Sequence, residues 1–431
     1  MIFTLLRLDL ELITPGGVTA PESLTDRDIG VDLPLARDGQ GRLHVPATSL
    51  AGSLRSCAPD PAALFGEVRQ NAGETTATAS PVRFLGTRVS AAEPIATSRT
   101  VIDRERGAPR THLLWRGELL PEGSRVTGYL RLDDPGLLDE LLAVLAAWRP
   151  FIGGGRSVGR GQARLTQVRG RTIDLSTAPG LRDWLTGGGP ALFADEVTEP
   201  VDLPVVEPSA EVLRWEWDVV DGLRVGTGGR DETSDEGEGR ASAPALLVRR
   251  AGKPCIPGST WKGVLRSRCE YILRSLGVPV CQPYECCRTC LVCETFGWTG
   301  GDEESVGQRS RLLFTDSIFT DARVVVRQHV ALDRVTGGAR DKQLYAEEIV
   351  ESGRCTLEVT VGGPLAPAAS ALLRLAVADL HDGFLAVGGS TTRGLGGLRR
   401  TDSAAESERL AAVEEFAAHV SAHATAGKAA L

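Results

Sequence analysis

The sequence VPATSLAGSLRS at residues 45–56 recurs in a second form, IPGSTWKGVLRS, at residues 256–267. Five of the twelve positions are identical, and several others are conservative replacements. Three further matches follow in the same order in both halves of the chain: Leu64–Gly66 with Thr295–Gly297, Val101–Arg104 with Ala331–Arg334, and Ser157–Gly161 with Ser390–Gly394. Four matches in one order indicate a duplication, so we expect two copies of one domain.

Hydrophobic periodicity supports the duplication. Residues 6–12 and 213–219 each alternate apolar and charged side chains, which is typical of a half-buried strand. A helix is predicted after each Pro-Ser/Thr motif, and a second helix at 136–148 and at 368–380, each followed by a glycine-rich loop and a last strand. Two strand–helix passages on one sheet, with extra strands between them, predict an α+β chain of two tandem ferredoxin-like, β-α-β-β-α-β domains.

The limits of the repeat and the distribution of prolines predict the domain boundaries. We expect the first domain at 1–170 and the second at 211–400. Residues 171–210 contain five prolines and are predicted to be a linker. The alanine-rich tail, 401–431, is predicted to be a surface helix that frays into disorder.

The charge distribution limits the possible partners. A formal net charge of −8 argues against simple, non-specific binding of nucleic acid. Acidic residues are concentrated at 231–238 and in the tail, however, whereas arginines crowd the glycine-rich loops, so a local basic path is compatible with the composition. The sequence has no run of roughly 18 uncharged apolar residues, and its charged N-terminal stretch is unlike a signal peptide. We therefore expect a soluble, cytoplasmic protein.

Two repeated elements have the chemistry of anion sites. Thr48 and Ser259 are predicted to cap helices, whose first-turn amides and dipole favour a phosphate. The glycine-rich loops can form amide nests for the same ligand. Ordinary capping and tight turns explain either element taken singly, but the paired copies favour binding of phosphates. The candidate RNA-binding residues are Ser49, Arg55, Gly154, Gly155, Arg156, Ser157, Arg160, Ser259, Thr260, Lys262, Arg266, Gly389, Ser390, Thr391 and Arg393.

A cysteine cluster predicts a metal site in the second half. Five cysteines fall within residues 281–293, and three of them follow the spacing Cys-x-x-Cys-x-x-Cys. In a reducing compartment, tetrahedral zinc explains this spacing better than disulfides or unpaired thiols do. The site is expected to be structural, and the first half, with only Cys57, lacks an equivalent. The preferred ligands are Cys281, Cys287, Cys290 and Cys293, with Cys286 as the alternative to Cys287.

Asp32 is the candidate catalytic residue. The sequence shows no Ser-His-Asp signature and no P-loop, and its six histidines are scattered. Asp32 lies in GVDLP at 30–34, and matching Pro34 with Pro244 of ASAP places Ser242 at the corresponding position of the second half. A plain turn residue before a proline is the alternative role for Asp32.

The ordered motifs resemble the RAMP superfamily: a Gly-Gly turn, Asp-x-Pro, Ile/Val-Pro-x-Ser/Thr before Leu-Arg-Ser, Cys-x-x-Cys with Phe-Gly, and a terminal Gly-x-Ser-x-x-Arg-Gly. More narrowly, they are similar to the repeated backbone subunits of type III CRISPR effector complexes, here fused as a pair over 1–170 and 211–400. The resemblance implies RRM-like domains bound along a guide RNA (crRNA). It also implies projecting β-hairpin thumbs, for which Ser98–Trp115 and Gln328–Glu351 are the candidates.

The same resemblance implies cleavage of the complementary target RNA within a complex that contains other type III subunits. The cut would use an Asp in a loop after the first strand and a divalent metal such as Mg²⁺, with attack by the neighbouring 2′-hydroxyl. Carried over, that residue is Asp32, with Asp26 and Asp28 as nearby alternatives. The second half is then either a binding-only repeat, or Asp231 or Asp235 replaces the missing carboxylate.

Three other functions compete with this hypothesis. The first is a purely structural crRNA-binding subunit without cleavage. The second is an endoribonuclease that processes precursor crRNA, although such enzymes typically need a histidine near the N-terminus and the earliest one here is His44. The third is a zinc-stabilised RNA-binding module outside CRISPR systems.

Overall fold

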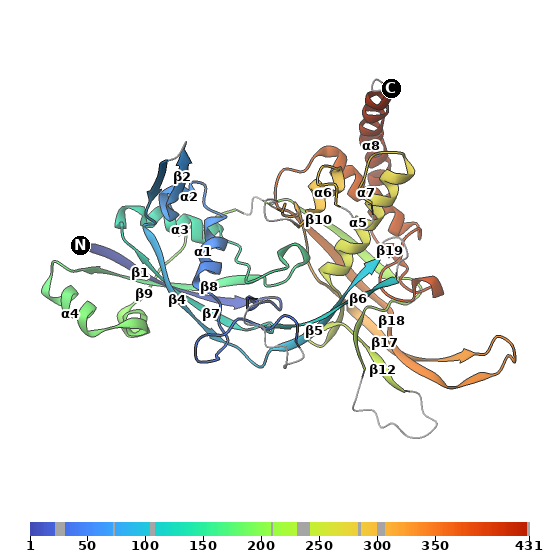
Figure 1. The fold of residues 1–431 in the computed structure, drawn as a ribbon, viewed down its shortest axis with the longest axis horizontal. Coiled ribbons are helices and arrows are strands. Elements are labelled where there is room, and N and C mark those ends of the chain that lie inside the picture. The colour runs from blue at the N-terminus through green and yellow to red at the C-terminus, as the bar shows by residue number, and fades with distance from the viewer. Residues whose placement is uncertain are drawn as a thin grey trace. The chain divides into compact units, whose positions relative to one another are not determined.

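The two repeats form separate compact units. The computed structural model describes residues 1–21, 31–71, 74–103, 108–207, 210–230, 242–282, 286–299 and 307–428 (Figure 1). The first unit comprises residues 1–99, 114–156 and 160–209. The second comprises residues 100–113, 157–159 and 210–431. Two short pieces of the first repeat, a hairpin tip and part of the glycine-rich loop, therefore cluster with the second unit.

The first unit has the predicted ferredoxin-like order. Its principal elements are β1 (Ile2–Leu12), α1 (Ala47–Arg55), β4 (Val82–Ser90), β7 (Arg125–Leu132), α3 (Leu138–Ala147) and β8 (Ala163–Asp174). The sheet order is β4-β7-β1-β8-β9, and its neighbours pair antiparallel. The first four strands of that path are the second, third, first and fourth of a β-α-β-β-α-β unit, as the periodicity predicted.

Alternation along β1 separates two cores. Leu6, Leu8, Leu10 and Leu12 are buried with the apolar residues of α1 and α3. Leu5 packs on the opposite face in a smaller cluster with Phe3 and Phe193, where α4 also lies (Figure 1). Successive side chains of a strand point to opposite faces of the sheet. The charged residues that alternate with these leucines therefore lie on the other, less buried face.

The smaller elements of the first unit surround this sheet. They are α2 (Pro61–Phe65), β2 (Glu67–Asn71), β3 (Glu74–Thr78), β5 (Ile95–Asp103), β6 (Ala108–Leu119), α4 (Ala178–Thr186) and β9 (Glu199–Pro200). Residues 171–207 are not an irregular connector: they complete β8, form α4 and add β9 to the edge of the sheet. Pro179 and Pro190 lie in the first turns of α4 and of a short 3-10 helix, where a missing N–H is tolerated, and Pro200 lies in the edge strand β9.

The second unit repeats the topology. Its principal elements are β10 (Val212–Val219), α5 (Gly258–Ser275), β15 (Leu312–Phe314), β18 (Ala339–Val361), α7 (Pro367–His381) and β19 (Leu398–Arg400). β18 pairs with β15 and β10, and β10 pairs with β19, which gives the same second-third-first-fourth order. The remaining elements are β11 (Gly226–Arg230), β12 (Ser242–Leu247), β13 (Arg249–Arg250), β14 (Lys253–Ile256), α6 (Leu291–Phe296), β16 (Ser317–Ile318), β17 (Thr320–Leu332) and α8 (Ala405–Lys428).

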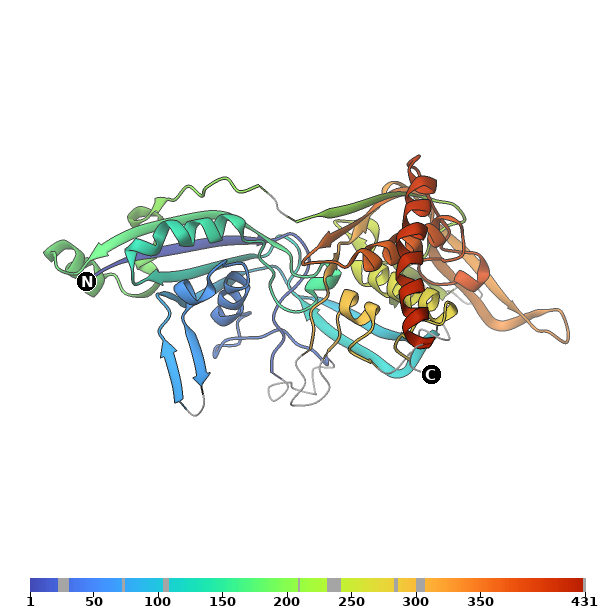
Figure 2. The ribbon, with the colours of Figure 1, turned by 90° about the horizontal axis from the view of Figure 1, so that it is seen from above.

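The tail helix α8 is part of the second core, which corrects the prediction of a fraying surface helix. Ala412 and Phe416, one turn apart, are 0% and 3% exposed and pack in the second hydrophobic cluster. α8 lies against α7 (Figure 2), and Glu415 pairs with Arg374 of that helix. Residues four apart lie on one face of a helix, so Ala412 and Phe416 both face the core. The helix can therefore pack there although its sequence is only weakly apolar.

Both candidate thumbs are β-hairpins. β5 and β6 form a two-stranded ribbon, and β17 pairs with the long strand β18. The β17–β18 hairpin extends beyond the rest of the second unit's sheet (Figure 1). We call these the first and second hairpins.

Candidate nucleic-acid interface and metal centre

Matching hydrogen bonds align the two repeats residue by residue. The N–H of Leu35 donates to Oε2 of Glu118 at 3.0 Å, and the N–H of Leu247 donates to Oε2 of Glu348 at 2.9 Å. An arginine two residues after each leucine pairs with the same glutamate. Sequence reasoning missed this bond, although the common signal, Leu-x-Arg before the Pro-Ser/Thr motif, is present in both halves.

This register corrects the predicted partner of Asp32. If Leu35 corresponds to Leu247, then Asp32 corresponds to Pro244, two residues beyond Ser242. The parallel pairing of Leu33 with Gly117 and of Ala245 with Glu347 agrees. The sequence-based match paired Pro34 with Pro244 because the two residues are identical. Identity at one residue does not determine which backbone groups pair in the sheet.

Asp32 is held at the base of the first hairpin. Its N–H donates to the carbonyl of Arg116 at 3.0 Å, and its Oδ2 accepts the N–H of Arg116 at 2.7 Å. The side chain is exposed, and Oδ1 has no hydrogen-bond partner among the residues that the structure describes. Asp26, Asp28, Asp231 and Asp235 lie outside the described residues.

The glycine-rich loops also align two residues away from the predicted match. Gly161 donates to the carbonyl of Pro15, and Gly396 donates to the carbonyl of Gly222. Gly161 therefore corresponds to Gly396, whereas the sequence match paired it with Gly394. As a result Arg160 corresponds to a buried leucine, and the two loop arginines do not occupy equivalent positions.

The first loop requires glycine at its closest contact. Gly153 has φ of 85°, and a Cβ there would lie 1.7 Å from the carbonyl oxygen of Gly17. Beyond this contact, the Arg156 guanidinium lies 4.7 Å from the centre of the Phe151 ring. Gly154 and Gly155 precede it, and Arg160 packs its stem against the Gly155 position. The glycine backbone of this loop and its two arginines, Arg156 and Arg160, thus lie within a few residues of one another in the sequence.

The second loop contacts its own hairpin. Ser390 adopts φ of 61°, in the left-handed region, and its Oγ accepts from Nη2 of Arg393. Nη1 of Arg393 donates to the Tyr345 hydroxyl at 2.6 Å. The backbone N–H of Gly389 donates to the carbonyl of Arg224 at 2.7 Å, while Thr391 is exposed.

The predicted helix caps are wrong. α1 and α5 begin after Pro46 and Pro257, and neither helix has a side-chain cap. Thr48 and Ser259 lie within the first turn and are exposed. A cap side chain accepts from amides two or three residues ahead, which a residue already inside the turn does not do here.

The start of α5 already binds a carboxylate. Oδ1 of Asp316 accepts the N–H of Gly258 at 2.9 Å, and Oδ2 pairs with Nε of Arg250 at 2.7 Å. Within the second unit, a Cβ on Gly258 would lie 2.7 Å from the carbonyl of Val158. An internal anion and close packing thus occupy the place where a phosphate was predicted to bind.

Three predicted basic contacts serve the protein instead. Nη1 of Arg55 donates to the carbonyl of Gly66 at 2.8 Å, and Nη1 of Arg266 donates to that of Gly297 at 3.0 Å. The repeated Leu-Arg-Ser and Phe-Gly motifs therefore bind each other. Nζ of Lys262 donates to Oγ of Ser157 at 2.8 Å, and burial, with a smaller contribution from Arg266, lowers the pKa of Lys262 to about 8. Ser49 and Thr260 are half-buried beside them.

The exposed side of α1 adjoins a pocket of about 300 Å³ in the first unit. Its lining is mostly apolar and includes two aromatic rings. The lining residues are Ala47, Thr48, Ala51, Gly52, Arg55, Phe65, Ser80, Val82 and Phe84.

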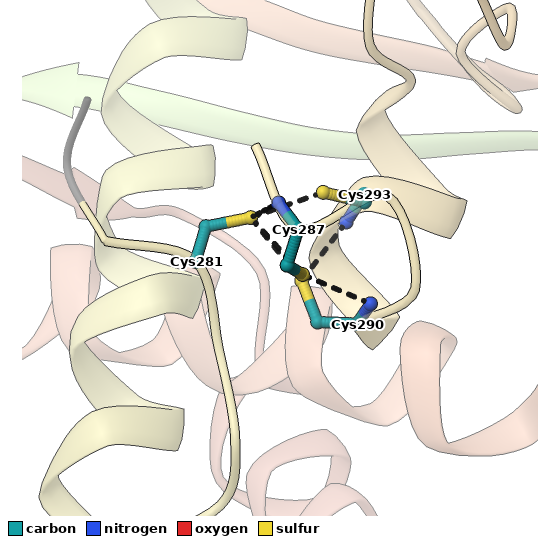
Figure 3. Close-up of side chains that lie close together, drawn as sticks. All are labelled: Cys281, Cys287, Cys290 and Cys293. Atoms are coloured by element: carbon teal, nitrogen blue, oxygen red, sulfur yellow. Dashed lines mark hydrogen bonds between the residues drawn. The ribbon is translucent and has the colours of Figure 1, made fainter. Parts of the chain in front are cut away.

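The cysteine cluster has the geometry of a metal site. The four sulfurs of Cys281, Cys287, Cys290 and Cys293 all lie within 4.8 Å of one another and converge from the loop after α5 and from the start of α6 (Figure 3). Sγ of Cys281 is 3.4, 3.6 and 3.1 Å from the other three. A disulfide requires about 2.05 Å, whereas a tetrahedron with Zn–S bonds of about 2.3 Å has edges of about 3.8 Å. The cluster therefore fits a metal such as zinc.

Hydrogen bonds orient the thiols before any ion binds. The N–H of Cys290 donates to Sγ of Cys287, and the N–H of Cys293 donates to Sγ of Cys290. Burial raises the pKa of Cys281 to about 11, and burial and neighbouring thiols raise the pKa of Cys293. Burial also acts to raise the pKa of Cys287, but hydrogen bonds, first that from the Thr289 backbone, outweigh it and lower the value to about 6. Sγ of the alternative ligand, Cys286, lies 3.2 Å from Cys293.

Comparison with known proteins identifies the family. Residues 9–164 and 181–399 match the model of the RAMP superfamily, and the chain belongs to that superfamily. No curated protein sequence matches it significantly. RAMP proteins bind crRNA and act in multi-subunit CRISPR complexes, and some are RNA endonucleases. A CRISPR-associated RNA-binding function is therefore the general assignment. Within the described part of the chain, no helix is long and apolar enough to cross a membrane.

Proposed function

We propose that this chain is a crRNA-binding backbone subunit of a type III CRISPR effector complex and that its first repeat cleaves the paired target RNA through Asp32. One observation carries the cleavage assignment. An exposed carboxylate is fixed at the base of a hairpin by the backbone of Arg116, which leaves Oδ1 without a partner among the described residues.

The oriented carboxylate suits the chemistry of RNA cleavage. Oδ1 of Asp32 can accept the proton of a 2′-hydroxyl, or it can bind a divalent ion, because Mg²⁺ prefers oxygen ligands. Such an ion, when bound, would neutralise charge on the scissile phosphate. The fixed Oδ2 restricts rotation of the carboxylate, so little reorganisation is needed when RNA arrives.

Three of the arginines first expected to contact the guide keep that assignment. Arg156 and Arg160 in the first loop, and Arg393 in the second, remain the candidate phosphate contacts. Arg55, Lys262 and Arg266 are engaged with protein atoms, so we assign them a supporting role. The pocket beside α1, with its aromatic lining, is of a size that a nucleobase can enter.

We also propose that the cysteine cluster holds structural zinc. Val292 and Phe296, on the same helix α6 as the candidate ligand Cys293, are buried in the second core. Four protein ligands leave no open coordination position, so the ion would fix this helix without taking part in RNA cleavage.

The test of the cleavage assignment uses the full chain assembled with guide RNA and its partner subunits. Asp32→Ala and Asp32→Asn are expected to remove one of the cuts in the target RNA, with guide content unchanged. Asp139→Asn, an exposed aspartate in the first turn of α3, is the matched control. If Asp32→Ala leaves every cut at its original rate, the chain is the purely structural subunit that forms the second candidate function. The replacement of Asp32 by Pro244 already favours that role for the second repeat.

A further inference from the structure

A fifth cysteine lies beside the candidate metal site. The sulfurs of Cys281, Cys287, Cys290 and Cys293 lie close together (Figure 3), and Cys286 is outside that set. Its Sγ is nevertheless 3.2 Å from Sγ of Cys293, close to the 3.1 Å that separates the sulfurs of Cys281 and Cys293. Cys286 is exposed, whereas Cys293 is fully buried. An exposed thiol thus contacts a buried candidate ligand.

The proposed ion needs only four sulfurs. Structural zinc takes four ligands in a tetrahedron, and the four clustered cysteines supply all of them. Cys286 then keeps a free thiol at the protein surface, beside a sulfur that the ion would hold. Accessible thiols next to a second cysteine are typical targets of peroxides, because the second sulfur converts the first oxidation product to a disulfide. Cys286 therefore has the surroundings of an oxidation site.

Cys293 is the disulfide partner that the geometry favours. The neighbouring Cys287 is a poor partner, because consecutive Cα atoms lie about 3.8 Å apart, below the range of about 4.4–6.8 Å that is usual for disulfides. A bond to Cys293 requires the two sulfurs to approach from 3.2 Å to about 2.05 Å, which is a movement of roughly 1 Å. Cys286 is exposed in the loop between α5 and α6, so a small rotation of its side chain can provide that movement.

The cysteines outside this loop are poorer targets for an oxidant. Cys255, Cys269 and Cys355 are buried in the second unit, where a reagent in solution does not reach them. Burial also raises the pKa of each of these three thiols, which keeps them protonated and weakly nucleophilic. Cys57 is half-buried in the first unit. It therefore serves as a control for oxidation away from the metal site.

We propose that Cys286 and Cys293 form an oxidation-sensitive pair through which a peroxide opens the metal site. The inference rests on the proposed zinc site. The Cys286 sulfur attacks hydrogen peroxide, so that an S–O bond forms, the O–O bond breaks and water leaves. The Cys293 sulfur then attacks the sulfenic acid on Cys286: the S–S bond forms, the S–O bond breaks, and the departing hydroxide takes a proton from solvent. Two electrons pass from the two sulfurs to the peroxide, and a thiol reductant reverses the change.

Loss of the Cys293 sulfur as a ligand would loosen α6. The three remaining sulfurs hold an ion less tightly, so the metal dissociates. Cys293 and Phe296 both belong to α6, and the Phe296 ring stacks on Phe314 of β15 with centroids 6.1 Å apart. The carbonyl of Gly297, directly after α6, accepts from Arg266 of α5 at 3.0 Å. Oxidation at the cysteine loop would therefore weaken the packing of both helices in the second unit.

The test treats the full, zinc-loaded chain with hydrogen peroxide and follows metal release with a chromogenic chelator. We expect the release of zinc to parallel the loss of two thiols, and the peptide map to contain a Cys286–Cys293 disulfide. Cys286→Ser should hold zinc before treatment and then release it at least about 10-fold more slowly than the wild type. Cys57→Ser is the matched control and should release zinc at the wild-type rate. The oxidised second unit should unfold at the Tm of Cys293→Ser, because both proteins lack the same ligand.

Dithiothreitol with added zinc should restore the metal content and the original Tm, which irreversible damage would not allow. The inference is overturned if this recovery fails, if Cys286→Ser releases zinc as fast as the wild type, or if the mapped disulfide joins a different pair. It also fails if Cys286→Ser holds no zinc, since Cys286 would then be a ligand. Wild-type protein without zinc before treatment contradicts the proposed metal site itself, and the peptide map still decides whether Cys286 and Cys293 form a bond.

Discussion

Replacement of Cys293 by serine tests the proposed zinc site most directly. The side chain is fully buried, and its sulfur lies 3.1 Å from that of Cys281. The three sulfur–sulfur distances from Cys281, 3.1 to 3.6 Å, fall short of the tetrahedral edge of about 3.8 Å by a few tenths of an ångström. Small outward shifts would admit the ion, so little of its binding energy should be spent on rearrangement.

The expected effect is large because α6 belongs to the core. Structural zinc sites contribute roughly 10–16 kcal/mol of apparent binding free energy. If the loss of one ligand removes only about 4 kcal/mol from the second unit, its Tm should fall by about 8–16 °C at this size. The first unit, which has no such cluster among its described residues, should unfold at an unchanged temperature.

The assay combines elemental analysis with thermal unfolding of the full chain. We expect one zinc per wild-type chain and less than about one tenth of that in Cys293→Ser. Cys57→Ser, in the first unit, is the control and should keep the metal. Comparison of Cys286→Ser with Cys287→Ser decides between the two neighbouring ligands. Wild-type protein that carries no metal, or a Cys293→Ser variant that keeps a full equivalent, would refute the reasoning.

Three further predictions concern stability. Phe416→Ala should lower the free energy of unfolding by about 3–5 kcal/mol in urea, because the ring is 3% exposed in the core; the exposed Leu410→Ala is the control, and equal effects would contradict the packing of α8. Arg55→Ala leaves the carbonyl of Gly66 without its donor and should cost about 1–3 kcal/mol in the same assay; a loss of guide affinity at unchanged stability would contradict this role. Lys262 has a folded pKa of about 8 against an ordinary value of 10.5, so the unfolded state binds more protons between these values. Stability should therefore rise by up to about 3 kcal/mol from pH 8 to 10.5, and this rise should be absent in Lys262→Met but kept in the exposed control Lys253→Met.

The sequence by itself determined the duplication, the β-α-β-β-α-β order and the cysteine cluster that fits a metal. These features depend on neighbours along the chain: alternation in residues 6–12, an apolar face in the helix after Pro257, and five cysteines within thirteen residues. Short-range patterns of this kind are visible without knowing how distant strands pair. The packing of α8 was not predicted, because only the tertiary structure shows that Ala412 and Phe416 pack in the core beside α7.

Only the tertiary structure decided the register of the repeats and the occupants of each site. Asp32 matches Pro244 because Glu118 and Glu348 accept equivalent hydrogen bonds from a leucine N–H in the two halves. In each half the leucine and the glutamate are separated by about a hundred residues or fewer in the sequence. The same long-range pairing brings Asp316 to the start of α5, where the sequence predicted a phosphate. Hydrogen bonds across a sheet are set by backbone geometry, and a shift of two residues preserves the hydrophobic pattern, so periodicity could not fix that register.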